Sequence, residues 1–185
     1  MSVFRQFARG FLVVVAVMLP FLGMSSAGAA EKALLTQDAE AALQALYKHE
    51  PNAKALGEKA VGILVFPSIV RAGFIVGGSG GDGVLFKKEK AVAYYNSGTA
   101  SVGLQAGVQT FGYAVFFMTP GEMKKFENSK GWDIGAAPTV VVVDTGAGRE
   151  FNTMTAKSGI YAFIFNQEGL MAGMALQGQK ITRLK

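Results

Sequence analysis

The sequence predicts an α+β domain, mostly antiparallel β, with a strongly curved or barrel-like sheet, N-terminal helices and one short helix inserted mid-chain. Apolar residues recur at helical spacing near the start, whereas the chain after Ala60 consists of short β-branched or aromatic runs. Many of the 24 glycines divide these runs. Because the bulges and corners of curved sheets favour glycine, we expect the strands to curl rather than lie flat.

A cleavable signal peptide is predicted over residues 1–30. Arg5 and Arg9 precede an apolar stretch at 11–24, and the small residues of a cleavage site follow. An uncleaved membrane anchor is the alternative, but this stretch is shorter than the roughly 20 apolar residues of a spanning helix and contains Pro20. We therefore expect an exported protein that is periplasmic, outer-membrane-associated or secreted.

Residues 31–185 are expected to form a single domain, with cleavage leaving an N-terminus between Gly28 and Glu31. Loss of the two signal arginines lowers the Lys and Arg count from 18 to 16 against 13 Asp and Glu, a net charge of +3. This charge suits an anionic membrane surface but is too small for a nucleic-acid-binding protein. The sequence has no cysteine, which excludes disulfides and thiolate metal sites.

Two helices are expected before the sheet, and a third within it. Apolar side chains at helical spacing from Leu35 to Leu46 predict an amphipathic helix that ends near His49-Glu50, because Pro51 follows. A second, short helix is predicted over 52–58. The third begins at a capping box and runs to about Asn128; the box consists of Thr119, Pro120 and Glu122.

Short strands separated by turn residues make up the rest of the expected sheet. Two of them, 139–143 and 160–165, are apolar on both faces, so we expect them either to be buried on both sides or to line a tightly curved sheet. The predicted strands are 60–66, 74–76, 84–87, 91–95, 101–105, 110–118, 139–143, 160–165, 170–176 and 180–184.

Two motifs suggest chemistry that the surrounding sequence does not support. Residues 78–83 match the dinucleotide fingerprint G-x-G-x-x-G, but a strand rather than the required helix is predicted next. We interpret the segment as a flexible hairpin loop with Asp82 as a turn residue. Ser79 also fits the nucleophile elbow G-x-S-x-G, but the sole histidine, His49, precedes it and cannot follow as its base. No catalytic residue, metal site or cofactor is therefore predicted.

Two groups of basic residues are candidates for lipid binding. One group is expected at a hairpin tip, and the other lies in the last predicted strand and just after it. Charge that only keeps turns and edge strands soluble is the alternative; contact with lipid phosphates is the functional interpretation. The candidates are Lys87, Lys88, Lys90, Lys180, Arg183 and Lys185.

Several stretches, taken together, resemble the SYLF family, a lipid-binding family of bacterial exported proteins and eukaryotic membrane-trafficking proteins. The bacterial branch is the nearest, because the chain begins with an export signal. The matching stretches cover nearly all of 31–185 in order and lie at 60–67, 72–78, 83–85, 101–109, 163–173 and 178–182.

The resemblance implies association with membranes, chiefly with phosphoinositides in the eukaryotic members, and contact with actin in the fungal ones. It supplies no agreed catalytic residues. We therefore expect a non-enzymatic envelope protein that binds an anionic lipid or membrane surface and no nucleic acid. The alternative is a structural or protein-interaction module of the envelope that has no lipid ligand.

Overall fold

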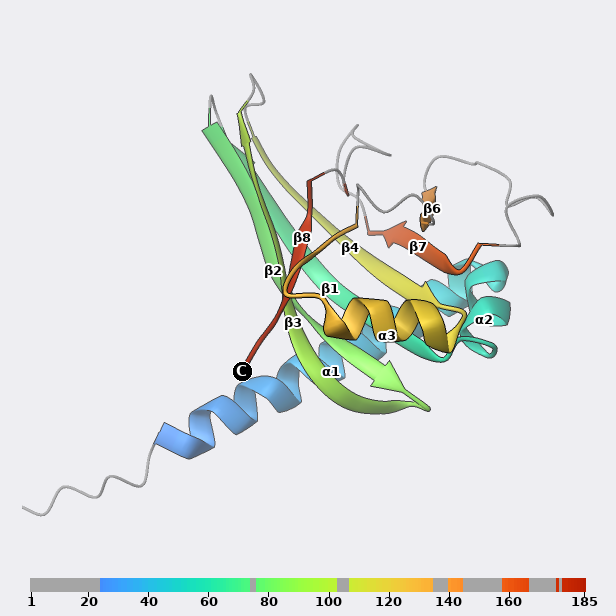
Figure 1. Cartoon of the computed structure of the whole chain (residues 1–185). Helices are drawn as coiled ribbons and strands as arrows, with labels where there is room; N and C mark the ends of the chain where they lie inside the picture. The colour runs from blue at the N-terminus through green and yellow to red at the C-terminus, as the bar shows by residue number, and fades with distance from the viewer. Residues whose placement is uncertain are drawn as a thin grey trace, which may run out of the picture.

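The computed structural model of the chain describes residues 24–73, 76–102, 107–134, 140–144, 158–166, 176 and 178–185. Within this part, the predicted fold class is confirmed (Figure 1): a mixed, mostly antiparallel half-barrel sheet follows N-terminal helices, and one helix is inserted mid-chain. Most of the predicted signal peptide, and all of the predicted strand 170–176 except Leu176, lie outside the described residues.

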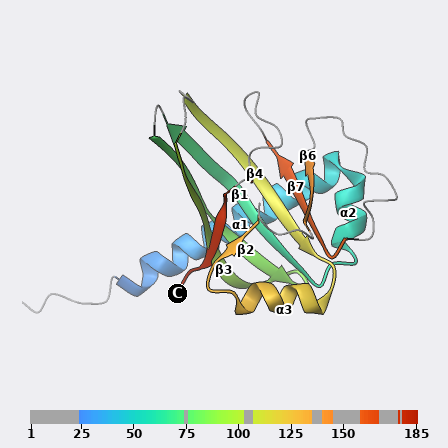
Figure 2. The same ribbon diagram turned by 45° about the horizontal axis from the view of Figure 1, so that its top comes forward.

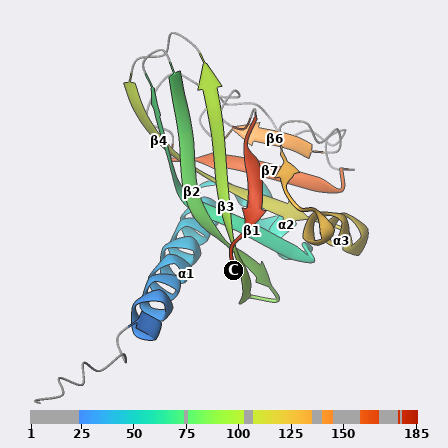
Figure 3. The same ribbon diagram turned by 60° about the vertical axis from the view of Figure 1, so that its left-hand side comes forward.

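The sheet has eight strands in the order β5-β8-β3-β2-β1-β4-β7-β6. All neighbours pair antiparallel except β6 and β7, which are parallel. Figure 3 shows the four long strands β1 to β4 side by side and strongly twisted. The strands are β1 (Gly62–Gly73), β2 (Val76–Lys87), β3 (Lys90–Val102), β4 (Gly107–Phe117), β5 (Trp132–Asp133), β6 (Val140–Asp144), β7 (Ile160–Phe165) and β8 (Lys180–Arg183).

The glycine-rich segment 78–83 lies inside a strand. The predicted run 84–87 and Val76, the last residue of the predicted run 74–76, fall on β2, which pairs with β1 on one side and β3 on the other; residues 74 and 75 lie outside the described part of the chain. The interpretation of 78–83 as a flexible loop is therefore wrong: β3 pairs with the whole segment and β1 with residues 78–80, and this pairing holds the backbone extended despite the low strand propensity of glycine. Asp82 is accordingly not a turn residue, and its carboxylate accepts a hydrogen bond from Asn96 Nδ2 at 2.7 Å.

A proline also lies within a strand. β1 continues past Pro67 to Gly73, well beyond the predicted end at Phe66. Proline has no N–H to donate, and the pairing of β1 with β4 shifts register between Phe66 and Ile69. This bulge accommodates Pro67 without ending the strand.

Both faces of the sheet are covered, and each cover forms its own hydrophobic core. Along β1, Leu64 and Phe66 belong to one core and Val65 to the other. The first, the α3-side core, includes Met123 and Phe126 of helix α3 (Pro120–Asn128). The second, the α1-side core, is closed by α1 (Met24–His49) and α2 (Pro51–Gly57). Figure 2 shows α1 and α3 on opposite faces of the sheet.

The two strands that read as apolar on both faces differ in burial. All six residues of β7 are buried because it lies between β4 and β6 with a core on each face. The prediction for 160–165 is therefore confirmed. For 139–143, of which the structure describes 140–143, burial on both sides is wrong: β6 is an edge strand, and the side chain of Val142 is 40% exposed.

The predicted helix boundaries are confirmed where capping residues marked them. α1 ends at His49, and α2 begins at Pro51 with Glu50 as its N-cap, whose side chain accepts from the Asn52 N–H at 3.2 Å. The Thr119 hydroxyl caps α3 by accepting from the Glu122 N–H at 3.2 Å. α1 begins before the amphipathic segment; its residues 28–34 are exposed, and its N-terminal end extends beyond the sheet (Figure 1).

Candidate functional site

The first basic group lies on a two-residue hairpin turn, as predicted. Lys87 of β2 pairs with Lys90 of β3, and Lys88 and Glu89 form the turn between them. Their φ angles are 48° and 63°. Two successive left-handed residues make the tight turn whose twist matches that of the flanking strands. The turn therefore fixes the directions in which its two side chains point.

The three hairpin lysines carry their charge in different surroundings. The Nζ of Lys87 lies 2.7 Å from the Oε1 of Glu127 on α3, and both side chains are about one-third exposed. This ion pair neutralises Lys87 and joins the hairpin to α3. Lys88 and Lys90 are exposed, and no described residue forms an ion pair with either. Two charges of this group therefore face solvent.

The second basic group is divided between the two faces of β8. Arg183 is directly opposite Tyr95, so it lies on the face of the α3-side core. Lys180 is three residues earlier, which places it on the other face because successive strand residues alternate. Lys185 follows the strand, and its carbonyl oxygen accepts from Lys32 Nζ of α1 at 3.4 Å. Lys32 therefore joins this group from α1.

The structure places both groups beside one strand but not on one face. β8 pairs with β3 around Tyr95, and the hairpin begins five residues earlier at Lys90. At about 3.3 Å per residue, the groups are roughly 16 Å apart along β3. Lys180 and Arg183 point away from each other, so the six candidates do not form a single patch. Whether they bind lipid stays a prediction.

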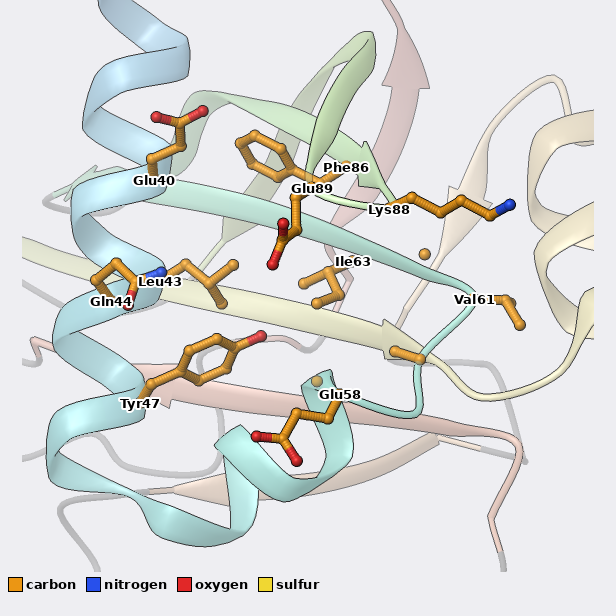
Figure 4. Close-up of a pocket in the computed structure, with 13 residues that line it drawn as sticks. Glu40, Leu43, Gln44, Tyr47, Glu58, Val61, Ile63, Phe86, Lys88 and Glu89 are labelled. Atoms are coloured by element: carbon orange, nitrogen blue, oxygen red, sulfur yellow. The ribbon is translucent and has the colours of Figure 1, made fainter.

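A cavity of about 840 Å³ lies beside the hairpin, between α1, α2 and the sheet. Its floor is apolar and includes Leu43, Ile63 and Phe86. Figure 4 shows the hydroxyl of Tyr47 and the carboxylate of Glu89 pointing into the cavity in front of Ile63, while the ammonium of Lys88 points away. Both turn residues are exposed, and the hairpin turn directs the carboxylate toward the cavity and the ammonium away from it.

The charged side chains of the cavity are mostly acidic. Glu40 and Glu58 also line it, so three carboxylates stand against the single ammonium of Lys88. Burial, and to a smaller extent the charges of Glu58 and Glu89, raise the pKa of Tyr47 to about 12. Tyr47 thus stays a neutral hydroxyl, able to donate or accept, throughout the physiological pH range.

Space for the Tyr47 hydroxyl depends on the residue at position 57. A β-carbon at Gly57 would overlap the hydroxyl oxygen and ring of Tyr47. Gly57 is the last residue of α2. Any larger residue at position 57 would therefore push the hydroxyl out of its place in the cavity.

Ser79, the serine of the elbow-like motif, belongs to a buried polar network. Its hydroxyl accepts from Gln179 Nε2 at 2.5 Å, and Gln179 Oε1 in turn accepts from Ser97 at 3.0 Å. The hydroxyl of Tyr113 donates to Ser97 at 2.6 Å. His49 lies at the end of α1, on a different element from Ser79. The network links three strands and the residue before β8, and it resembles no nucleophile–base pair.

Some side chains of these sites were not among the residues singled out from the sequence. Tyr47 lies four residues after Leu43, so it shares the apolar face of α1. That spacing is the one signal that could have placed it beside the sheet. Lys32 stands on the exposed part of α1, 5.4 Å above the ring of Tyr94. Lys32 lies beside Lys185 only because the fold brings together two residues that are 153 positions apart in the sequence.

The described residues carry neither a spanning helix nor a metal cluster. None of their helices is both long and apolar enough to cross a membrane. Within the same part of the chain, no group of three or more His, Asp or Glu side chains is placed to hold a metal ion.

Comparison with protein families places part of the chain beside a known family. Residues 98–185 match the model of the Ysc84 family, described as Las17-binding protein actin regulator. The resemblance to the SYLF family is thereby confirmed over this part of the chain, from β3 to the last residue. The family is associated with lipid and actin binding and is generally a non-catalytic binding domain. The curated proteins contain no match to the chain.

Proposed function

From the Ysc84 match of residues 98–185, we propose that this protein is a non-enzymatic module that binds an anionic membrane surface in the cell envelope. One observation supports it most: Lys88 and Lys90 stand exposed at the tip of a hairpin that a tight turn and the Lys87–Glu127 ion pair hold in place. A fixed pair of exposed ammonium groups meets lipid phosphates with little loss of side-chain and backbone freedom.

The expected strength follows from the number of unpaired charges. A basic residue near an anionic surface contributes about 1 kcal/mol. Because Glu127 already pairs with Lys87, the hairpin contributes mainly through Lys88 and Lys90, about 2 kcal/mol or a thirtyfold change in partitioning. Lys180 and Arg183 lie on opposite faces, so only one of them can meet a flat membrane in a given orientation.

We test this by flotation of the purified protein with vesicles of zwitterionic lipid containing increasing fractions of anionic lipid. Charge reversal at Lys88 and Lys90 should abolish most binding, while reversal at Lys180, Arg183 and Lys185 should cost less. Lys54→Glu, an exposed lysine on α2, is the matched control and should have little effect. Unchanged binding in both group variants, with circular dichroism showing an intact fold, would refute the basic-surface mechanism.

The proposed envelope location rests on the export signal predicted from the sequence. Cleavage between Gly28 and Glu31 would remove the first turns of α1. Residues 28–34 of this helix are all exposed. Removal would therefore cost no buried contact among these residues. Intact mass of protein from the periplasm checks the site; a product that retains residues 11–24 would contradict export by cleavage.

A protein-interaction module is the second candidate, favoured by exposed valines on the sheet. Val70 and Val108 are 48% and 73% exposed. Ala72 is opposite Val108, so the three side chains share one face at the far end of β1 and β4. Salt separates the two functions: electrostatic binding to vesicles weakens as salt is added, whereas an apolar protein contact does not.

A further inference from the structure

The cavity between α1, α2 and the hairpin has a size and lining suited to a small ligand. Its volume of about 840 Å³ falls within the range of roughly 300–1,000 Å³ typical of ligand sites. The floor is formed by residues of the α1-side core: Leu43 is 9% exposed and Phe86 is 4% exposed. An apolar chain laid on this floor would be withdrawn from water, which favours binding.

The polar groups above the floor select the charge of that ligand. The carboxylate of Glu89 and the hydroxyl of Tyr47 point into the cavity, and Glu58 lies below Tyr47 (Figure 4). No described residue forms an ion pair with Glu58 or Glu89. Lys88, the one cation of the lining, points out of the cavity in the same view. A cationic group placed there would meet two carboxylates and a neutral hydroxyl.

We propose that this cavity binds an amphiphile with a positively charged head, its apolar chain on Leu43, Ile63 and Phe86 and its ammonium group between Glu58, Glu89 and Tyr47. Charge complementarity identifies the occupant: the exposed carboxylates at the rim of the cavity offer hydrogen-bond acceptors and negative charge, so an anionic amphiphile of equal length would be repelled. The site goes beyond the proposed binding of anionic membranes, which uses lysines on the outside of the hairpin.

The backbone of the turn supports a role for Glu89. Both turn residues have φ between 48° and 63°, a region that Asn and Gly occupy at lower cost than Lys and Glu. The strained turn aims the Glu89 carboxylate inward and the Lys88 ammonium outward (Figure 4). The sequence therefore keeps an acid at a position where glycine would suit the backbone better.

Calorimetric titration of the purified protein with decylammonium tests the site directly. Decanoate and decanol carry the same chain with an anionic or a neutral head, and all three are used below the concentrations at which they aggregate. We expect saturable, one-to-one binding of decylammonium and at least tenfold weaker binding of decanoate. Shortening the alkylammonium should cost about fourfold in affinity for each methylene removed.

Variants then assign the head group. Glu89→Gln should weaken decylammonium about tenfold and leave decanol unchanged, because only the charge is removed. Asp38→Asn, the same loss of charge on an exposed residue of α1 outside the lining, should change neither. Equal binding of decanoate and decylammonium, an unaffected Glu89→Gln variant, or the absence of saturable binding would each overturn the proposal.

A vesicle arm identifies the natural source of the ammonium group. Uncharged vesicles that contain phosphatidylethanolamine offer it on a lipid headgroup. Binding to them that decylammonium displaces assigns the site to the headgroup, whereas decylammonium binding without such displacement assigns it to a free amphiphile. Both outcomes support the site. The calorimetric titration with decylammonium contains no anionic membrane. It can therefore fail while the flotation experiment succeeds, or the reverse, so the cavity proposal and the proposed function are tested independently.

Discussion

Replacing Ser97 by alanine should destabilise the protein by about 2 kcal/mol, because it removes the acceptor of the Tyr113 hydroxyl. Both residues are fully buried, and burial raises the pKa of Tyr113 well above its ordinary value. Water cannot replace the lost partner at a fully buried hydroxyl without opening the sheet. Leaving such a group unsatisfied costs about 1–3 kcal/mol, more than the net value of the hydrogen bond itself.

Removing the Tyr113 hydroxyl instead should lower the free energy of unfolding by a smaller amount. Tyr113→Phe deletes the donor, while Ser97 keeps its hydrogen bond to Gln179 Oε1, so we expect a loss of about 1 kcal/mol. In the double variant neither hydroxyl remains to be desolvated. Its destabilisation should therefore fall short of the sum of the single effects by about 1 kcal/mol.

Equilibrium unfolding in urea measures these free energies, with fluorescence of the sole tryptophan as the probe. Trp132 lies against Phe126 in the α3-side core, ring centroids 5.4 Å apart, so its emission reports unfolding of that core. Ser68→Ala, at an exposed serine of β1, is the control and should change stability by less than about 0.5 kcal/mol. Additive single and double variants would refute the network argument.

Three further effects follow from local geometry. Replacing Lys88 by Asn together with Glu89 by Gly should stabilise the hairpin by about 1–2 kcal/mol in urea unfolding, since both positions have positive φ. The pKa of the Tyr47 hydroxyl is about 12 in the folded state and about 10 in the unfolded chain, so the folded state favours the neutral hydroxyl. The resulting stabilisation is fully present below pH 10 and is lost as the pH rises toward 12. Tyr47→Phe should flatten this decline in urea unfolding measured at several pH values. Gly83→Ala should cost about 1–3 kcal/mol, because its β-carbon would lie 2.5 Å from a ring atom of Phe66; an unchanged urea midpoint would contradict this contact.

The elements with explicit boundary residues were predictable from the sequence. Pro51 and the Thr119 cap fix helix ends through local chemistry, and β7 reads as buried because both of its faces are apolar. The segment 78–83 was not predictable in this way. Its extended backbone depends on pairing with β1 and β3, and glycine carries no side-chain pattern that could announce such pairing.

The candidate site was predictable only in its exposed part. The run from Lys87 to Lys90 indicates a charged hairpin tip, but the partner of Lys87 is Glu127, forty residues later. The cavity combines Tyr47, Glu58 and Glu89 from α1, the end of α2 and the hairpin. No local pattern connects these three residues, because only the packing of the helices onto the sheet brings them together.

The strand order has a consequence for how the chain can fold. β3 borders β8 in the finished sheet, and the network that joins them links Ser97 to Gln179, 82 residues apart in the sequence. A contact across so long a loop forms slowly, because the entropy of closing the loop is lost before the contact can stabilise it. Until β8 arrives, that edge of β3 is unpaired and able to add a strand from another molecule. During folding, β8 of the same chain therefore competes with strands of other protein molecules for this edge of β3. The concentration of the protein decides which of the two pairs with it.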